Sequence, residues 1–337
     1  MGKRTFWIVL VLALAFPAVL LGWSYRGHVN ITDAAIRLLP EPLGRFYQLN
    51  HGSIAAHSVD PDLWVENKTG TPAYAHYIDM DLLDDPPFDG IPKEYADAVR
   101  KFGEEKLKKA GTLPWEIARR QGELTASFRE GRWSDVAMQS SWLSHFVADS
   151  TMPLHTTKNY LGQLSGNLVL PDRGPNRSVH HRLEWGLLET FPEHYDRLIG
   201  RREEVKKIDD VLAMTWKTLK ESYGLIPEVL SADKKASDED SSFGPAYYEK
   251  LDQLARPTVD RQLKRAQELV ASVWLSAWEA AGKPEPPTKQ VVVDWEKPRA
   301  GDKQESLKKS VILILIAASM ALILVGALLR TRRRRRN

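Results

Sequence analysis

Apolar residues recur along the middle of the chain at the three- and four-residue spacing of amphipathic helices, and the alternation typical of strands is scarce. We find no internal repeat. The pattern predicts helices over residues 30–40, 91–110, 132–150, 178–191 and 259–282. The chain is therefore expected to be all-α, with one compact, bundle-like helical domain over residues 23–282.

Polar, Gly- and Pro-containing stretches separate the predicted helices. Residues 79–92, 162–178 and 231–245 are expected to be irregular, and the acidic, serine-rich third stretch is expected to be mobile. Residues 283–310 are polar and contain several prolines, which is typical of a linker.

Both ends of the chain carry apolar segments beside basic residues. Lys3, Arg4 and the apolar run that follows predict a signal peptide over residues 1–22. Leu20 and Gly22 are not an ideal A-x-A cleavage site, so an uncleaved anchor remains the alternative. Residues 311–329 are apolar or small and uncharged, long enough for one transmembrane helix.

The arginine-rich tail, residues 330–337, is expected to be cytoplasmic. The sequence thus predicts an exported domain that a C-terminal transmembrane helix anchors in the membrane, with residues 23–282 outside the cytoplasm.

Charge and cysteine content narrow the possible functions. Eight of the 47 basic residues lie in the two terminal segments, whereas all 44 acidic residues lie between them, so the central part carries a net charge of −5. Tight electrostatic binding of duplex nucleic acid is therefore not expected. Because the chain has no cysteine, disulfides and thiolate ligands are excluded, and any zinc site must use His, Asp and Glu.

Histidines and carboxylates recur at helical spacing. His145 and Asp149 lie four residues apart, as do His180 and Glu184, so each pair shares one face of a predicted helix. One such pair is weak evidence, since surface pairs are common. Two pairs, joined by further candidates, indicate a zinc site built from nitrogen and oxygen ligands; the further candidates are His28, Asp60, Asp62, His76 and His155.

Four motifs appear in a fixed order: W-x4-H in "WSYRGH", D-x13-H in "PDLW…AHYID", H-x3-D-x5-H in "HFVADSTMPLH", and H-x3-E in "HHRLE". Together they resemble the zinc-dependent phospholipase C superfamily, which includes the plant and fungal single-strand-specific nucleases. The resemblance spans most of residues 23–184 and implies a trinuclear zinc (Zn²⁺) site within a helical bundle.

The resemblance also assigns ligands. It implies one zinc on Asp62, His76, His145 and Asp149, a second on His155, His180 and Glu184, and a third on His28, Asp149 as a bridge, and the α-amino group and carbonyl of Trp23. A primary amine binds metal only when it is free and deprotonated, so this assignment requires signal cleavage immediately before Trp23.

Some assignments have competitors. Asp62 lies 14 residues before His76 and is followed by "LW", which matches the family pattern; Asp60 stays open as a residue that orients a ligand from behind. His181 competes with His180, but only His180 has a carboxylate four residues later. The remaining histidines match no motif and are expected to be ordinary surface or core residues: His51, His57 and His194.

The resemblance implies hydrolysis of a phosphodiester by a hydroxide that bridges two zincs, with Asp62 as a possible general base. "HYID" is similar to the segment of the nucleases in which an aromatic ring stacks on a nucleobase and an Asp binds its edge. Tyr77 and Asp79 stand at these positions, although ordinary core packing explains Tyr77 equally well.

Two substrate classes remain open. The W-x4-H spacing and "HYID" favour a nuclease or nucleotide-type phosphodiesterase acting on single-stranded nucleic acid or nucleotides. Val65 stands where the nucleases usually carry Arg, and Glu184 rather than Asp is typical of the phospholipase branch, so a phospholipase C acting on membrane phospholipids is the alternative. A catalytically silent, zinc-stabilised binding module is the second alternative. No obligate protein partner is evident.

Overall fold

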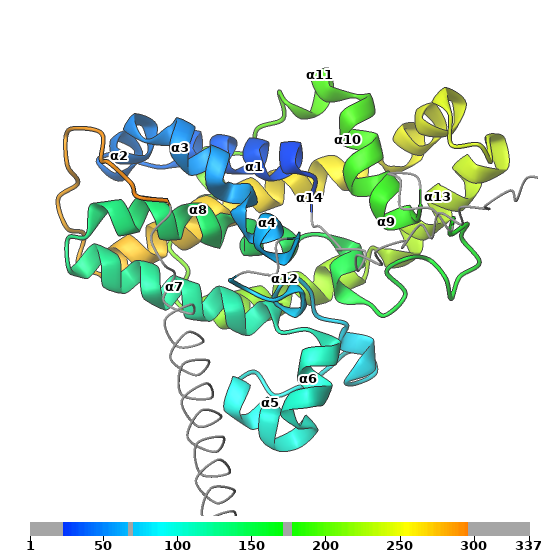
Figure 1. Ribbon diagram of the computed structural model, residues 1–337, viewed down its shortest axis with the longest axis horizontal. Helices are drawn as coiled ribbons and strands as arrows, with labels where there is room; N and C mark the ends of the chain where they lie inside the picture. Colours follow the sequence, from blue (N-terminus) through cyan, green and yellow to red (C-terminus); the bar gives the residue numbers. More distant parts are fainter. Residues whose placement is uncertain (1–22, 67–69, 171–176, 296–337) are drawn as a thin grey trace, which may run out of the picture.

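The computed structural model describes residues 23–66, 70–170 and 177–295 (Figure 1). Every regular element in these ranges is helical, which confirms the all-α prediction. The longer helices are α1 (Tyr25–Leu38), α7 (Leu113–Arg129), α8 (Trp133–Asp149), α12 (Val211–Tyr223), α13 (Ile226–Glu239) and α14 (Pro245–Ala280).

Short helices and single turns connect these elements. They are α2 (Leu43–Leu49), α3 (His51–Ala56), η1 (His57–Val59), α4 (Asp60–Glu66), η2 (Ala73–Ala75), η3 (Met80–Leu82), α5 (Tyr95–Phe102), α6 (Glu104–Ala110), η4 (Pro153–Thr156), α9 (Val179–His181), η5 (Arg182–Gly186), α10 (Leu187–Thr190), α11 (Pro192–Tyr195) and η6 (Arg202–Glu204).

The expected signal peptide (1–22), transmembrane segment (311–329) and arginine-rich tail (330–337) lie outside the described residues. Among the helices that the structure does describe, none combines the length and the apolar character needed to cross a membrane.

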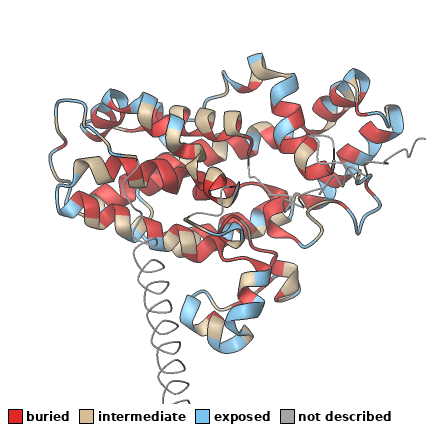
Figure 2. Ribbon diagram, viewed as in Figure 1, coloured by how far each residue is buried: buried red, intermediate tan, exposed pale blue. Residues whose placement is uncertain are grey.

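Helix α14 organises the domain. Its 36 residues pack against α1, α7, α8 and α13, and Figure 1 shows it running along the long axis of the bundle. Val259, Leu263, Ala266 and Val270 recur at helical spacing and are buried, as are the facing sides of the surrounding helices (Figure 2). A hydrogen bond from the indole of Trp274 to the carbonyl of Ser140 (3.1 Å) ties α14 to α8.

The predicted helices are confirmed with altered boundaries. The expected helix over 91–110 is interrupted at Gly103, where a φ of 80° separates α5 from α6. The helix expected over 259–282 begins much earlier, at Pro245, and α7 and α12 were not predicted.

The prediction of an irregular, mobile stretch over residues 231–245 was wrong for its first part, because α13 continues to Glu239. Val229, Leu230, Ala232 and Ala236 are buried at helical spacing against α14. Asp233 is also fully buried, in an ion pair, so a polar composition concealed an inward face.

The segment that follows α14 lies against the domain. The Trp278 indole donates to the carbonyl of Pro284 (2.9 Å), and the backbone amide of Val291 donates to Oδ1 of Asn50 (3.0 Å). Val291 and Val293 pack on buried apolar residues. Thus the first part of the expected linker, residues 283–295, is docked, and residues 296–310 lie outside the described part of the chain.

Candidate metal centre

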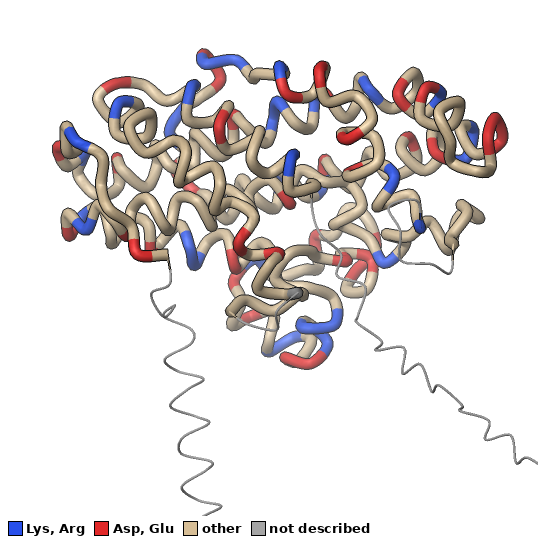
Figure 3. Tube along the Cα trace, turned by 45° about the horizontal axis from the view of Figure 1, so that its top comes forward, with Lys and Arg blue, Asp and Glu red and all other residues tan. Residues whose placement is uncertain are grey.

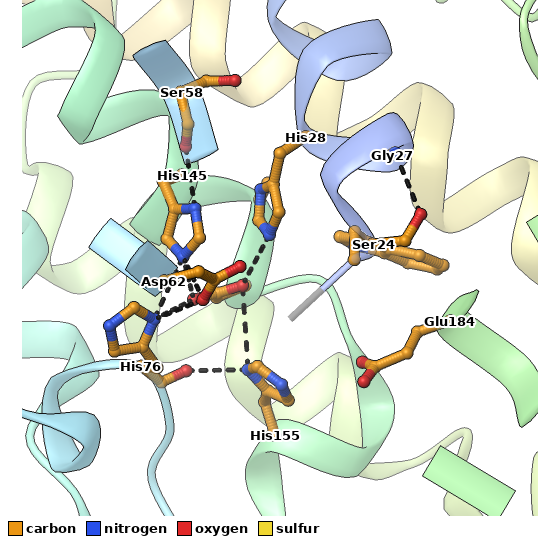
Figure 4. A network of polar contacts seen from close by, with 12 residues as sticks. Ser24, Gly27, His28, Ser58, Asp62, His76, His145, His155 and Glu184 are labelled. Carbon is orange, nitrogen blue, oxygen red and sulfur yellow. Dashed lines mark hydrogen bonds and ion pairs between the residues drawn. The ribbon is translucent and has the colours of Figure 1, made fainter. Parts of the chain in front are cut away.

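Seven elements and segments bring eight buried His, Asp and Glu side chains to one place. Figure 4 labels most of them: His28, Asp62, His76, His145, His155 and Glu184. Helix α8 contributes two of them, one turn apart, at its C-terminal end. The eight are His28 from α1, Asp62 from α4, His76 after η2, His145 and Asp149 from α8, His155 from η4, His180 from α9 and Glu184 from η5. All eight side-chain ligands that the resemblance implies therefore converge.

The tightest group has the spacing of a single tetrahedral ion. His145 Nε2 lies 3.3 Å from Asp62 Oδ1 and 3.4 Å from Asp149 Oδ2, while His76 Nδ1 lies 3.5 Å and 3.3 Å from the same two oxygens. The two nitrogens are 3.0 Å apart. Zinc–ligand bonds of about 2.05 Å in a tetrahedron place ligand atoms about 3.3 Å apart, so these four side chains fit one zinc.

A second group forms around η5. His180 Nε2 lies 2.9 Å from Glu184 Oε2, and the ring of His155 stands nearly perpendicular to that of His180, with centroids 5.0 Å apart. Their ligand atoms all lie within 4.8 Å of one another. The chain is π-helical from Arg182 to Gly186, a local widening that often marks functional sites.

A third group contains His28. Its Nε2 lies 3.5 Å from Asp149 Oδ1, and its ring stacks on that of His145 at 3.8 Å. The geometry therefore groups His28 with Asp149, as expected, and also with His145.

Trp23 begins the described chain next to this third group. Its side chain is fully buried and its indole donates to Thr151 Oγ1 (3.2 Å), while the backbone amide of the next residue, Ser24, donates to the carbonyl of Glu184 (3.3 Å). The Ser24 hydroxyl accepts from the Gly27 amide and begins α1. The residue before Trp23 lies outside the described residues, so the free amine stays a prediction.

Two backbone carbonyls orient the imidazoles. Ser58 O accepts from His145 Nδ1 (2.9 Å), and His76 O accepts from His155 Nδ1 (2.7 Å). A carbonyl can only accept, so Nδ1 of each ring carries a hydrogen, and in the neutral form of the ring Nε2 has the lone pair available for a metal. No sequence pattern indicated the role of Ser58.

The electrostatics of the first group centre on two carboxylates. Burial would lower the pKa of His145, but Asp62 and Asp149 outweigh it and raise this pKa to about 10. Burial would likewise raise the pKa of Asp149, yet the imidazoles of His145 and His155 hold it well below its usual range. Without a metal, an imidazolium therefore compensates the buried carboxylate charge.

Four further ligand candidates, three histidines and a glutamate, are disfavoured in their charged forms. Burial lowers the pKa of His28 and of His180 well below the ordinary value, and His155 is also lowered. Burial, reinforced by Asp62 and Asp149, raises the pKa of Glu184 well above its usual range. Neutral imidazoles are the form that binds a metal.

Hydrogen bonding in the described part of the chain leaves the cluster short of partners. Both carboxylate oxygens of Asp62 and of Asp149, both ring nitrogens of His28 and of His180, and Nε2 of His76 and His155 are buried without a hydrogen bond. Such groups cost about 1–3 kcal/mol each when unsatisfied. Convergent nitrogen and oxygen atoms without hydrogen bonds fit zinc, which would bind the carboxylate oxygens and one nitrogen of each imidazole.

A buried ion pair holds the π-helical turn that carries Glu184. Arg182 Nε and the Asp233 carboxylate lie 2.8 Å apart, and neither side chain is exposed. Tyr247 and Asn167 also donate to Asp233, at 2.6 Å and 2.7 Å. Arg182 stands between the two ligand candidates in "HHRLE", but its spacing alone gave no sign of a partner.

The competing candidates lie elsewhere. The Asp60 carboxylate is 3.1 Å from His57 Nδ1 and accepts a hydrogen bond of 3.1 Å from the Trp142 indole, so it faces away from the ligand groups. His181 contacts the hydroxyl of Ser178 instead of the cluster. The two other histidines make peripheral contacts: His51 with the Gln48 carbonyl and His194 with Asp260.

Tyr77 and Asp79 lie on the segment that leads away from His76. The backbone amide of Ile78, between them, donates to the carbonyl of His155 (2.9 Å). Gly111 allows this path, since a Cβ there would come within 2.1 Å of the Tyr77 carbonyl.

Burial governs the electrostatics of this pair. Burial raises the pKa of Asp79 to about 8, with Asp81 adding to the effect, and burial also raises that of Tyr77 to about 12. Tyr160, which was not predicted, interacts electrostatically with both and stands 6.3 Å from the ring of His180. An aromatic pair and a carboxyl group therefore lie beside the second ligand group.

Comparison with known proteins finds no matching family model and no similar curated protein. The assignment of a function therefore depends on the site itself.

Asp149→Asn should remove most of the bound zinc, because its two oxygens face different ligand groups and an amide cannot replace both. Metal analysis of the purified variant measures the loss. Asp135→Asn, in the first turn of the same helix, is the matched control and should keep the wild-type zinc content. Full zinc content in Asp149→Asn would contradict the bridging position.

Zinc binding should release protons near neutral pH. With a pKa of about 10, His145 is protonated in the metal-free protein, and zinc accepts only its neutral form. The apparent affinity should therefore rise with pH, by up to about tenfold per unit, until about pH 10. Calorimetric titration in buffers of different ionisation enthalpy counts the protons; a release of none at pH 7.5 would contradict the assignment.

Proposed function

We propose that this protein is a zinc-dependent phosphodiester hydrolase, of the kind represented by the zinc-dependent phospholipase C and single-strand-specific nuclease superfamily. The observation that carries the proposal is the convergence of eight buried His, Asp and Glu side chains, many of whose oxygens and nitrogens have no hydrogen bond in the described part of the chain.

The three ligand groups would hold three ions, with Asp149 shared between two of them and the Trp23 backbone completing the third after signal cleavage. Zinc bound there would activate water for attack on phosphorus and would neutralise the charge on the phosphate oxygens. The second ligand group has three protein side chains, so a zinc there would keep one position open, which is typical of catalytic zinc and supports an enzyme over a silent binding module.

The chain's own residues would orient the imidazole ligands and accept a proton. Ser58 and His76 hold the His145 and His155 rings through their carbonyls. Asp62 Oδ1 faces the two imidazoles, and its second oxygen, Oδ2, is buried without a hydrogen bond in the described residues. We assign to Oδ2 the acceptance of the proton from the attacking water.

Nucleotide-type substrates rank first because an aromatic and acidic subsite adjoins the cluster. Tyr77 and Tyr160 provide ring faces for a nucleobase, and the Asp79 carboxyl group would bind its polar edge. Basic and acidic residues are interspersed along the described chain (Figure 3), so recognition would depend on this subsite rather than on a basic track.

A phospholipid is the second candidate, and a different observation favours it. The loop between His155 and His180 exposes Leu164, Leu168 and Val169, and Trp185 is exposed directly after Glu184. Exposed apolar side chains close to an active site suit contact with a lipid surface.

A side-by-side assay decides among the functions. Purified protein should hydrolyse single-stranded DNA or RNA faster than phosphatidylcholine vesicles, and a chelator should abolish the activity. Hydrolysis of the lipid alone would favour the second candidate. A zinc-loaded protein that cleaves none of the three would contradict the proposal and favour a silent binding module.

Two variants distinguish the aromatic subsite at Tyr77 from the exposed apolar loop at Leu164. Tyr77→Ala should raise KM for single-stranded DNA by about 5- to 150-fold, since stacking on an aromatic ring is worth about 1–3 kcal/mol per base. Leu164→Ser, on the exposed loop, should leave that KM unchanged and is the matched control. If instead Tyr77→Ala kept the wild-type KM and only Leu164→Ser lost activity, on phosphatidylcholine vesicles, the phospholipid would rank above the nucleic acid as substrate.

A further inference from the structure

The docked segment after α14 ends on a tryptophan that contacts the ligand-bearing part of the domain. The Trp295 indole stacks on the imidazole of His57 with centroids 3.7 Å apart and planes 7° from parallel. Val293 and Trp295 also pack on a small apolar cluster formed by Trp64, Met138 and Trp142.

This stacking contact lies on the turn η1, which leads directly into α4. His57 belongs to η1, and its Nδ1 lies 3.1 Å from each oxygen of Asp60, the first residue of α4. From the inside, the Trp142 indole of α8 donates to the same carboxylate at 3.1 Å. The segment from His57 to Trp64 therefore has contacts both with α8 and with the Trp295 ring, which itself packs on the cluster that includes two α8 residues, Met138 and Trp142.

That same segment serves the first ligand group twice. The carbonyl of Ser58, in η1, accepts the hydrogen of His145 Nδ1 and so directs Nε2 toward the cluster. In the first turn of α4, Asp62 supplies the carboxylate that lies 3.3 Å from His145 Nε2. A shift of η1 and α4 would move both the orienting carbonyl and the ligand oxygen.

We propose that Trp295 is a positioning residue for the first zinc ligand group, through which the C-terminal docked segment stabilises the metal-binding geometry of Asp62 and His145. The inference rests on the proposed function, because it concerns zinc affinity at that group. Trp295 touches none of the ligands itself and acts through His57, Ser58 and α4.

The position of Trp295 separates this role from a general contribution to the core. Its side chain is partly exposed and joins a satellite cluster rather than the main core. Removing the ring should therefore leave the fold intact and loosen the η1–α4 segment selectively.

The test uses the full chain and three variants. Trp295→Ala removes the stacking ring, Trp295→Phe keeps an aromatic face, and Val292→Ala changes a residue of the same segment that is 92% exposed. Zinc affinity is measured by competition with a chromophoric chelator. Hydrogen exchange of peptides covering residues 57–66 is measured in the metal-free protein.

Removing a residue that directly orients a metal ligand costs about 10- to 100-fold in metal affinity. Trp295 contacts such residues rather than the ligands, so Trp295→Ala should weaken the tightest measured zinc binding by about tenfold, the lower end of that range. Exchange over residues 57–66 should become faster in this variant. Trp295→Phe and Val292→Ala should match the wild type in both measurements.

The outcomes separate the two proposals. Wild-type protein that binds no zinc would overturn the proposed function and this inference together. Wild-type zinc binding with the same affinity in Trp295→Ala would overturn the inference alone, as would unchanged hydrogen exchange over residues 57–66. An equal loss in Val292→Ala would show a general effect of the segment and would also overturn the role of the Trp295 ring.

Discussion

The site depends on one buried carboxylate, that of Asp149, at the end of α8. A buried charge is unfavourable unless its surroundings compensate it. Here one oxygen faces His28 and His155 and the other faces His76 and His145, at 3.3–3.9 Å. The convergence of four imidazoles on one anion explains why segments far apart in the sequence must meet at this point.

The domain holds the imidazoles from behind with contacts that are themselves buried. The carbonyls of Ser58 and His76 fix two of the rings, and the Arg182–Asp233 ion pair holds the turn that carries Glu184. Trp295 stacks on His57, which belongs to the same turn, η1, as Ser58. Such support allows a cluster of mutually repelling or desolvated groups to persist until a metal binds.

Local patterns predicted much of this arrangement. The four-residue spacing of His145 and Asp149, and of His180 and Glu184, placed each pair on one helical face, and the structure brings both pairs into the cluster. The spacing to His76 and the following "LW" selected Asp62 over Asp60, and the carboxylate four residues later selected His180 over His181, in agreement with where these side chains lie. Their roles as zinc ligands remain part of the proposal.

The features that escaped prediction depend on contacts between distant segments. The helix over residues 231–239 was not predicted from their acidic composition, because the burial of Asp233 depends on an ion pair with Arg182, which is distant in the sequence. Ser58 acts through a carbonyl, which no side-chain pattern records. The docking of residues 283–295 depends on the half-buried ring of His57 and on the cluster around Trp64, neither of which the polar composition of the segment reveals.

Anomalous diffraction at the zinc absorption edge, from crystals of the purified protein, tests the central claim most directly. The account predicts three peaks: one among Asp62, His76, His145 and Asp149, one among His155, His180 and Glu184, and one beside His28 and Trp23. Crystals grown with zinc that show no anomalous peak among these side chains would contradict it.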